Sequence, residues 1–174
     1  MDQDNLIYFA YGSNMFSQRL QAKKRCPSAR PMGIAELRGH ALKWHKKSKK
    51  DGSGKCDIVE STDPQAFVLG ALFEIASEEK GALDRAEGLG YGYEEIDIKV
   101  LRDGVPLTAK AYRATNVDPA LKPYTWYRSL VVAGAREHEL SPDYITRLEA
   151  VPACDDPDRA RHEENMRLID GGRS

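Results

Sequence analysis

Near its beginning the chain reads Leu6-Ile7-Tyr8-Phe9-Ala10-Tyr11-Gly12-Ser13-Asn14-Met15. The five apolar or aromatic residues at 6–10 predict a buried strand, which the Gly-Ser-Asn at 12–14 ends. Phe16 and Leu20 follow one helical turn apart, so we expect a helix directly after the break, with Asn14 as its N-cap. Such a corner leaves several backbone N–H groups unpaired and directed at one point, which suits an anion or a polarised carbonyl. An ordinary strand–turn–helix corner is the alternative.

A second segment, residues 83–93, reads Leu-Asp-Arg-Ala-Glu-Gly-Leu-Gly-Tyr-Gly-Tyr. Ser77, Glu78 and Glu79 predict the start of a short helix, because acidic residues stabilise the positive end of the helix dipole. Three glycines between 88 and 92 end this helix, so we expect Glu87 on its last turn, just before a flexible loop. A carboxylate placed there is a candidate general acid/base. A solvated surface glutamate is the alternative.

Together the Tyr-Gly-Ser-Asn loop at 11–14 and the Glu87-Gly88 segment resemble the two signature pieces of the γ-glutamylcyclotransferase family, also called AIG2-like. The resemblance extends over about residues 6–150. It includes Thr115-Asn116 after a strand, a helix that begins near Tyr127 and ends in Gly134-Ala135, and a helix start at Ser141-Pro142. The family implies an α+β fold, a small mixed β-barrel with helices packed outside it.

The resemblance also implies a chemistry: the α-amine of a γ-glutamyl compound attacks its own γ-carbonyl, forming 5-oxoproline and releasing an amine or amino acid. Glu87 is then the acid and base, and the segment Tyr8, Phe9, Ala10, Tyr11, Gly12 and Ser13 forms the substrate wall. The amides of Tyr11, Gly12 and Ser13 are the candidate oxyanion donors. Asn14 braces the loop, and Tyr127 is expected to bind the carboxylate or carbonyl of the substrate. The reaction needs no cofactor and no metal.

Two departures from the family pattern leave the released group open. Relatives specific for γ-glutamyl dipeptides often have tyrosine after Thr-Asn, where this chain has Val117. They also favour Gly-Gly-apolar-small where residues 54–57 read Gly-Lys-Cys-Asp. A γ-glutamyl amine is therefore an alternative to a γ-glutamyl amino acid. Asn14 argues against glutathione, since glutathione-specific relatives usually carry another residue there.

The remaining pattern favours strands first and helices late. Strands are expected at 34–44, 56–60, 66–75, 95–100 and 107–114, with a hairpin turn at Asp103-Gly104. Helices are expected at about 124–138, 142–150 and 157–169, the second capped by Ser141. Strands partly joined by hairpins indicate an α+β class and not a doubly wound sheet.

Composition limits the organisation and the partners. A chain of 174 residues with 41% hydrophobic content suits one core, so residues 1–174 are expected to form a single domain with a helical tail from about 155. A formal charge of −1, no membrane-length apolar run and an acidic start argue against bulk nucleic-acid or membrane binding and against a signal peptide. Three scattered cysteines indicate reduced, buried thiols in a cytoplasmic protein. We expect a monomer or a homodimer.

One basic run needs separate treatment. It consists of His45 and six lysines, which are Lys43, Lys46, Lys47, Lys49, Lys50 and Lys55. We expect a solvated, flexible loop between two strands. The alternatives are a border of the active site that attracts an anionic substrate and an RNA-binding module. The Gly52-Ser53-Gly54-Lys55 stretch is no phosphate-binding P-loop, since Lys49 and Cys56 stand where that motif needs Gly and Ser or Thr.

Overall fold

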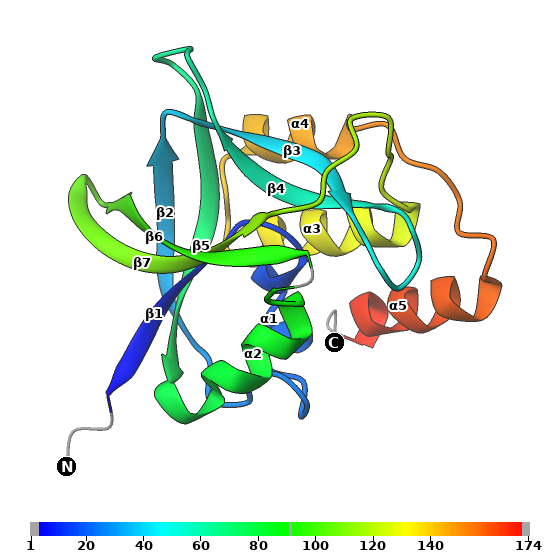
Figure 1. Ribbon diagram of the computed structural model, residues 1–174, viewed down its shortest axis with the longest axis horizontal. Coiled ribbons are helices and arrows are strands. Elements are labelled where there is room, and N and C mark those ends of the chain that lie inside the picture. The colour runs from blue at the N-terminus through cyan, green and yellow to red at the C-terminus, as the bar shows by residue number, and fades with distance from the viewer. Residues whose placement is uncertain (1–3, 91, 172–174) are drawn as a thin grey trace.

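Five strands of this protein close into a barrel in the order β1-β5-β2-β6-β7 (Figure 1). The structure is a computed structural model that describes residues 4–90 and 92–171. The strands are β1 (Asn5–Ala10), β2 (Arg30–Arg38), β5 (Phe67–Ala76), β6 (Tyr93–Arg102) and β7 (Val105–Ala114). β1 joins β7 in parallel, with Tyr8 opposite Lys110, whereas the other pairs are antiparallel. The predicted α+β class and small mixed barrel are therefore confirmed.

The barrel interior is filled from alternate positions of its strands. Phe9, Val68, Leu72 and Val100 are completely buried. Gly70 makes room for the Phe9 side chain. A Cβ at Gly70 would lie 2.6 Å from the Phe9 ring and 2.4 Å from the Ala10 carbonyl oxygen. A side chain there would expel Phe9, so this pair sets how closely β1 and β5 pack.

The β6–β7 hairpin matches its prediction. Ile98 and Val100 are buried while Asp97 and Lys99 are exposed, as the alternating pattern indicates. Asp103 and Gly104 both have positive φ, of 50° and 77°, which is the backbone of a tight two-residue hairpin turn.

The strand expected at 34–44 is wrong as one element. It is two strands, β2 and β3 (His40–Lys47), separated by Gly39 with a φ of 72°. β3 leaves the barrel and pairs with β4 (Gly54–Glu60) in a separate two-stranded sheet. The basic run is therefore not a flexible loop. Most of its lysines lie on the two strands of this hairpin, which contacts β5 and β7.

The helices gather on one side of the barrel, apart from α2 (Lys80–Glu87), which lies across the lower part of Figure 1. α3 (Thr125–Glu137) packs against α4 (Pro142–Glu149), α5 (Arg159–Gly171) and the short turn η1 (Ser13–Met15). Two further short helices are α1 (Ser17–Leu20) and η2 (Ser77–Glu79). Ser141 caps α4 as predicted, by accepting a hydrogen bond from the Tyr144 N–H.

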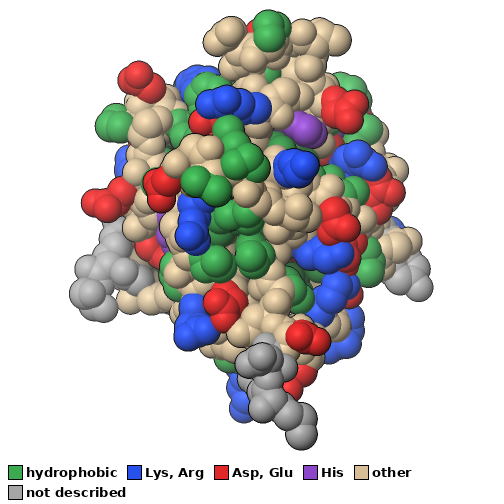
Figure 2. Space-filling view, turned by 90° about the vertical axis from the view of Figure 1, so that its left-hand side faces the viewer, with side chains coloured by type: hydrophobic (Ala, Val, Ile, Leu, Met, Phe, Trp, Pro, Cys, Tyr) green, Lys and Arg blue, Asp and Glu red, His purple; other side chains and the backbone are tan. Residues whose placement is uncertain are grey.

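The surface carries both signs of charge. Figure 2 shows the barrel side of the molecule, where Lys and Arg alternate with Asp and Glu around an apolar centre. Cys26 and Cys56 are buried as expected, but Cys154 is exposed, because it lies on the segment between α4 and α5. No helix among the described residues is long and apolar enough to cross a membrane.

Candidate active site

Glu87 is the last residue of α2. The helix ends there because Gly88 adopts the left-handed conformation, with a φ of 72° and a ψ of 43°. In this C-cap the Gly88 N–H donates to the Arg85 carbonyl and the Leu89 N–H donates to the Asp84 carbonyl. The turn leaves the Glu87 side chain half-buried and directed toward the end of β1.

Two donors hold the Glu87 carboxylate through the same oxygen. The Tyr8 hydroxyl donates to Oε1 at 3.1 Å, and the Asn14 amide Nδ2 donates to it at 2.6 Å. Asn14 is itself oriented by Arg25, whose guanidinium donates to its Oδ1 at 3.2 Å. Among the described residues no group bonds Oε2 of Glu87. This second oxygen is therefore free to exchange a proton with a bound molecule.

The role expected for Asn14 as an N-cap is wrong. The residue before η1 is Gly12, and no side chain caps this turn. Asn14 lies inside the turn and is buried, and its amide points at Tyr8 and Glu87. The tertiary contact with a carboxylate competes successfully with a local backbone bond, because a charge-assisted hydrogen bond is the stronger of the two.

The loop at 12–13 has unpaired backbone N–H groups and lies beside the Glu87 carboxylate. Within residues 4–90 and 92–171, neither the Gly12 nor the Ser13 N–H has a hydrogen-bond acceptor. Gly12 is also tightly enclosed: a Cβ there would lie 3.1 Å from the Cβ of Cys56 and 3.2 Å from the Tyr127 hydroxyl. Gly12, Ser13 and Glu87 line one cavity.

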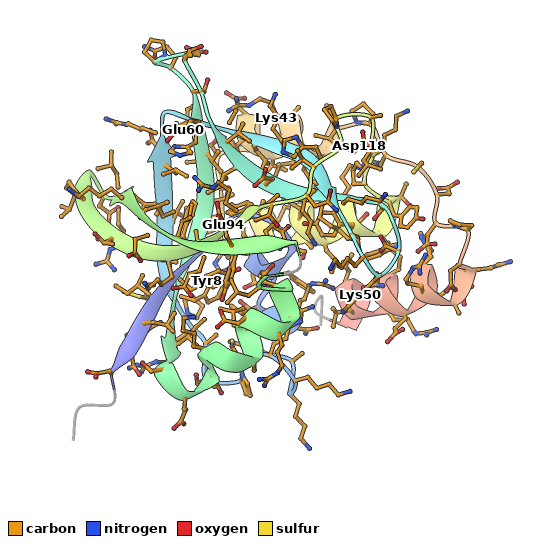
Figure 3. All side chains as sticks on the ribbon, viewed as in Figure 1. Tyr8, Lys43, Lys50, Glu60, Glu94 and Asp118 are labelled. Carbon is orange, nitrogen blue, oxygen red and sulfur yellow. The ribbon has the colours of Figure 1, made fainter. Side chains whose placement is uncertain are left out.

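This inner cavity has a volume of about 30 Å³ and a wall of tyrosines, and the Tyr8 side chain lies between β1 and α2 in Figure 3. Burial raises the pKa of Tyr8, Tyr11, Tyr93 and Tyr127 well above the usual range, so all four are neutral hydrogen-bond donors at neutral pH. Tyr93 donates to the Cys56 carbonyl at 2.7 Å. These bonds hold the wall in one arrangement.

Seven of the nine site residues expected from the sequence line the inner cavity. They are Tyr8, Tyr11, Gly12, Ser13, Asn14, Glu87 and Tyr127. Phe9 and Ala10 do not line it. Phe9 lies in the barrel core against Gly70, because successive residues of a strand point to opposite faces and Tyr8 takes the face toward α2.

Three residues that line the cavity and one that supports it were not predicted from the sequence. Cys56, Tyr93 and Tyr112 line the cavity, and Arg25 orients Asn14. Among these residues, the sequence pattern could have indicated only Tyr112. Tyr112 has the opposite parity along β7 to the buried Ala109 and Ala111, so its side chain lies on the outer face of the strand. α2 covers that face, and Tyr112 donates to Asp84 of α2 at 2.5 Å.

The inner cavity continues into an outer cavity of about 150 Å³, since both are lined by Ser13, Asn14, Glu87, Tyr93 and Tyr127. The outer cavity is rimmed by basic side chains from α1, the segment between α1 and β2, α2 and the β3–β4 hairpin. They are Arg19, Arg25, Lys46, Lys49, Lys50, Lys55 and Arg85. Figure 3 shows Lys50 at the turn of the hairpin. The basic run thus borders the candidate active site.

A larger cavity, of about 670 Å³, lies between α3 and α5. It contains neither Glu87 nor the open amides of the loop at 12–13, so we do not place the site there. The described residues contain no group of three or more His, Cys, Asp and Glu side chains that is arranged to hold a metal ion.

Comparison with known proteins gives a consistent answer. Residues 67–148 match the model of the AIG2-like family. The mouse γ-glutamylcyclotransferase is 31% identical over 154 residues, which cover 85% of this chain and 79% of that protein. The human γ-glutamylcyclotransferase is 29% identical over 160 residues, covering 88% and 82% of the two chains.

Solved structures agree with the sequence comparison. A γ-glutamyl cyclotransferase structure superposes with a TM-score of 0.86 at 28% identity, covering 97% of this chain and 100% of that one. YkqA from Bacillus subtilis shares the fold, with a TM-score of 0.73 and 22% identity. A relative that is 31% identical covers 85% of this chain, and the chain belongs to the γ-glutamylcyclotransferase family.

Proposed function

We propose that this protein is a γ-glutamylcyclotransferase that converts a γ-glutamyl compound into 5-oxoproline and releases a free amine or amino acid. The observation that carries the proposal is the Glu87 carboxylate, held through Oε1 by Tyr8 and Asn14 and facing the unpaired amides of Gly12 and Ser13. A base and a pair of oxyanion donors at one cavity suit an intramolecular acyl transfer.

The reaction places few demands on the protein, because the substrate contains both the nucleophile and the electrophile. The α-amine attacks the γ-carbonyl carbon, the new C–N bond closes a five-membered ring, and the old C–N bond to the leaving amine breaks. No water is consumed. Holding the substrate folded, so that nitrogen approaches carbon, supplies much of the rate enhancement.

Glu87 moves the proton that this exchange requires. Its free Oε2 accepts a proton from the attacking nitrogen and then donates it to the leaving nitrogen. The Gly12 and Ser13 N–H groups stabilise the negative charge that develops on the carbonyl oxygen. Tyr127, whose hydroxyl accepts from the Cys56 N–H at 3.1 Å, has its hydroxyl group at the same cavity for binding the glutamyl carboxylate.

A mechanism through an enzyme nucleophile has less support. Cys56 lines the cavity, but burial raises the pKa of its thiol well above the usual range. The thiol therefore stays protonated at neutral pH, and the thiolate is the reactive form of cysteine. Replacing Cys56 by alanine is expected to leave turnover measurable, whereas Glu87 has no substitute.

The test is an assay for 5-oxoproline by mass spectrometry on a panel of γ-glutamyl amino acids, γ-glutamyl amines and glutathione. Glu87→Gln keeps the shape of the side chain but cannot carry the proton, so turnover should fall about two to four orders of magnitude. The matched control is Glu94→Gln, which changes an exposed glutamate on β6 outside both cavities. Wild-type turnover by Glu87→Gln would refute the assignment.

An RNA-binding module is not favoured by these observations. The relatives are named as enzymes, and the basic hairpin rims a cavity of about 150 Å³ beside Glu87. A site for a small anion fits that position better than a nucleic-acid surface. Titration with single-stranded and duplex RNA at two salt concentrations tests this alternative, since binding through phosphates weakens steeply with salt.

A further inference from the structure

The outer cavity contains an excess of positive charge. Seven lysine and arginine side chains line it, and among the described residues Glu87 is the one carboxylate that does so. The whole chain has a formal charge of −1, so this concentration does not reflect a basic protein. The barrel side in Figure 2 shows the contrast, because there the two signs of charge are mixed.

Lys46 is the first of two buried or half-buried cations in this cavity that have no hydrogen-bond or ion-pair partner among the described residues. Its side chain comes from β3 and is 8% exposed, with Nζ lying 4.5 Å from the centre of the Tyr93 ring. Among the described residues it has no ion pair and no hydrogen-bond acceptor. Burial lowers the pKa of its ammonium group. A buried ammonium without an anion is costly, and the aromatic ring compensates for only part of that cost.

Arg19, on α1, is the second such cation in the outer cavity. Its Nε is buried and has no hydrogen-bond partner among the described residues. Burial lowers the pKa of its guanidinium to about 10, so the group is still charged at neutral pH. No ion pair joins Arg19 or Lys46 to Glu87 within the described part of the chain. Arg25 is hydrogen-bonded to Asn14 and Lys55 is paired with Asp51, whereas Lys49, Lys50 and Arg85, which also line the cavity, are exposed.

The position of these cations relative to the reaction identifies what they face. The reacting carbonyl must lie at Glu87 and the Gly12 and Ser13 amides, at the narrow inner end. That end is lined otherwise by neutral tyrosines and Cys56. The part of the substrate beyond the scissile bond then extends past Glu87 into the outer cavity.

We infer that the preferred substrate is a γ-glutamyl compound whose released amine carries at least two negative charges, as an acidic amino acid does. The glutamyl carboxylate of the substrate is placed at Tyr127 in the inner cavity. A single further carboxylate, present in any released amino acid, would therefore pair with one of the two cations and leave the other without an anion. This inference rests on the proposed function and names its substrate class. Two carboxylates or one phosphate ester meet the same requirement.

The decisive measurement compares substrates that differ in charge alone. γ-Glutamyl-glutamate and γ-glutamyl-glutamine have nearly the same shape, and γ-glutamyl-O-phosphoserine is paired in the same way with γ-glutamyl-serine. We expect kcat/KM to be about 10–150-fold higher for the more negative member of at least one pair, the range that one additional charged hydrogen bond provides. The pair that responds distinguishes carboxylate from phosphate, and the preference should shrink at high salt.

Variants test whether the named cations cause the preference. Lys46→Met keeps the aliphatic stem over Tyr93 and removes the charge, so the ratio of kcat/KM values within the responding pair should fall about tenfold. Arg19→Met should lower the same ratio. Lys47→Met is the matched control, because Lys47 is the exposed neighbour on β3 and does not line the outer cavity. It should leave the ratio unchanged.

The outcomes separate the two proposals. Absence of 5-oxoproline from every substrate, neutral ones included, would overturn the proposed function and this inference with it. Turnover of the neutral members equal to or faster than that of the charged members would overturn the inference alone. A charge preference that survives both Lys46→Met and Arg19→Met would also overturn it, whereas loss of the preference in either variant supports it.

Discussion

At the residue scale, the carboxylate of Glu87 depends on neighbours that are far away in the sequence. Tyr8 and Asn14 both donate to its Oε1, and they precede it by 79 and 73 residues. Arg25 in turn fixes the Asn14 amide. Because both donors act on one oxygen, the other remains available to the substrate, and the orientation of the carboxylate should be sensitive to each donor.

Removing the donors tests this arrangement. Asn14→Leu, which keeps the side-chain size, is expected to lower kcat at least tenfold, because a hydrogen bond to a charged group contributes about 1.5–3 kcal/mol. Tyr8→Phe should have a smaller effect, since its bond of 3.1 Å is longer than the 2.6 Å bond of Asn14. Steady-state kinetics with the best substrate, after a thermal melt to confirm folding, gives the answer. The reverse order would contradict the geometry.

Gly12 tests the loop. Gly12→Val should abolish measurable turnover, because even its Cβ would lie 3.1 Å from Cys56 and 3.2 Å from the Tyr127 hydroxyl, and the branched methyls would fill the inner cavity. Ser13→Ala should reduce turnover only modestly, since the Ser13 N–H remains. Comparable, mild effects of the two substitutions on kcat/KM would mean that the loop is a structural corner.

At the scale of elements, the short helix α2 positions the proposed acid/base. It starts in the 3₁₀ turn η2 and ends at Gly88, so its eight residues place Glu87 beside β1. The same helix covers Tyr112 through Asp84. Two glycines mark this helix and have different roles. Gly81 lies within α2, whereas Gly88 follows its last residue and forms the C-cap with a φ of 72°.

Alanine at these two glycines is expected to shift stability in opposite directions. Gly81→Ala should stabilise the protein by about 0.5–1 kcal/mol, because its Cβ meets nothing closer than Arg85 at 3.5 Å and alanine favours the helix. Gly88→Ala should cost about 1–2 kcal/mol, since the left-handed conformation is unfavourable for alanine. Each kcal/mol corresponds to about 2–4 °C in Tm for a domain of this size.

Thermal unfolding followed by circular dichroism distinguishes the two variants. Gly88→Ala should also reduce turnover, because the C-cap sets the direction of Glu87, and Gly88→Asn should recover part of both losses. If Gly81→Ala and Gly88→Ala shifted Tm in the same direction, the positive φ of Gly88 would not be what limits the residue at that position.

At the scale of the whole molecule, one buried carboxylate joins the C-terminal helix to the rest. Asp156 accepts hydrogen bonds from the Trp126 indole of α3 at 2.8 Å and from the Arg161 guanidinium of α5 at 2.5 Å. Arg161 and the Asp158 N–H hold the pKa of this carboxyl well below its usual range, at about 2. Whether the segment from about residue 155 is a tail on a single domain stays a prediction.

Acid should weaken this connection. The folded pKa of Asp156, about 2, lies below the ordinary value of 3.8, so its stabilisation is present at neutral pH and is lost as the pH falls from about 4 to about 2. Asp156→Asn is expected to lower the free energy of unfolding by about 1–3 kcal/mol at pH 7, with the difference from wild type closing near pH 2. Urea denaturation at several pH values measures this.

The control for that experiment is Asp155→Asn, which changes the exposed neighbour. It should leave stability unchanged at every pH. A pH-independent loss of stability in Asp156→Asn would mean that packing, and not the charge of this carboxylate, holds α5.

By itself, the sequence determined the elements whose signals are local. The strand before Gly12, the Asp103-Gly104 turn, the Ser141 cap and the end of α2 at Gly88 follow from neighbouring residues, because periodicity, turn chemistry and capping act over a few positions. The resemblance of the segments at 11–14 and 87–88 to known relatives indicated the family and the small barrel. The break at Gly39 has mixed apolar and charged residues on both sides, so periodicity alone did not divide the stretch.

Only the tertiary structure decided which side chains meet. Asn14 donates to Glu87 in place of a local cap, and Phe9 points into the core while Tyr8 faces α2. Lys46 is buried beside the active site with no anion among the described residues. Each of these depends on elements distant in the chain packing against one another, such as α2 on β1 and the β3–β4 hairpin beside β5 and β7. Contacts of that kind bring together residues with no common local pattern, and so no local pattern predicts them.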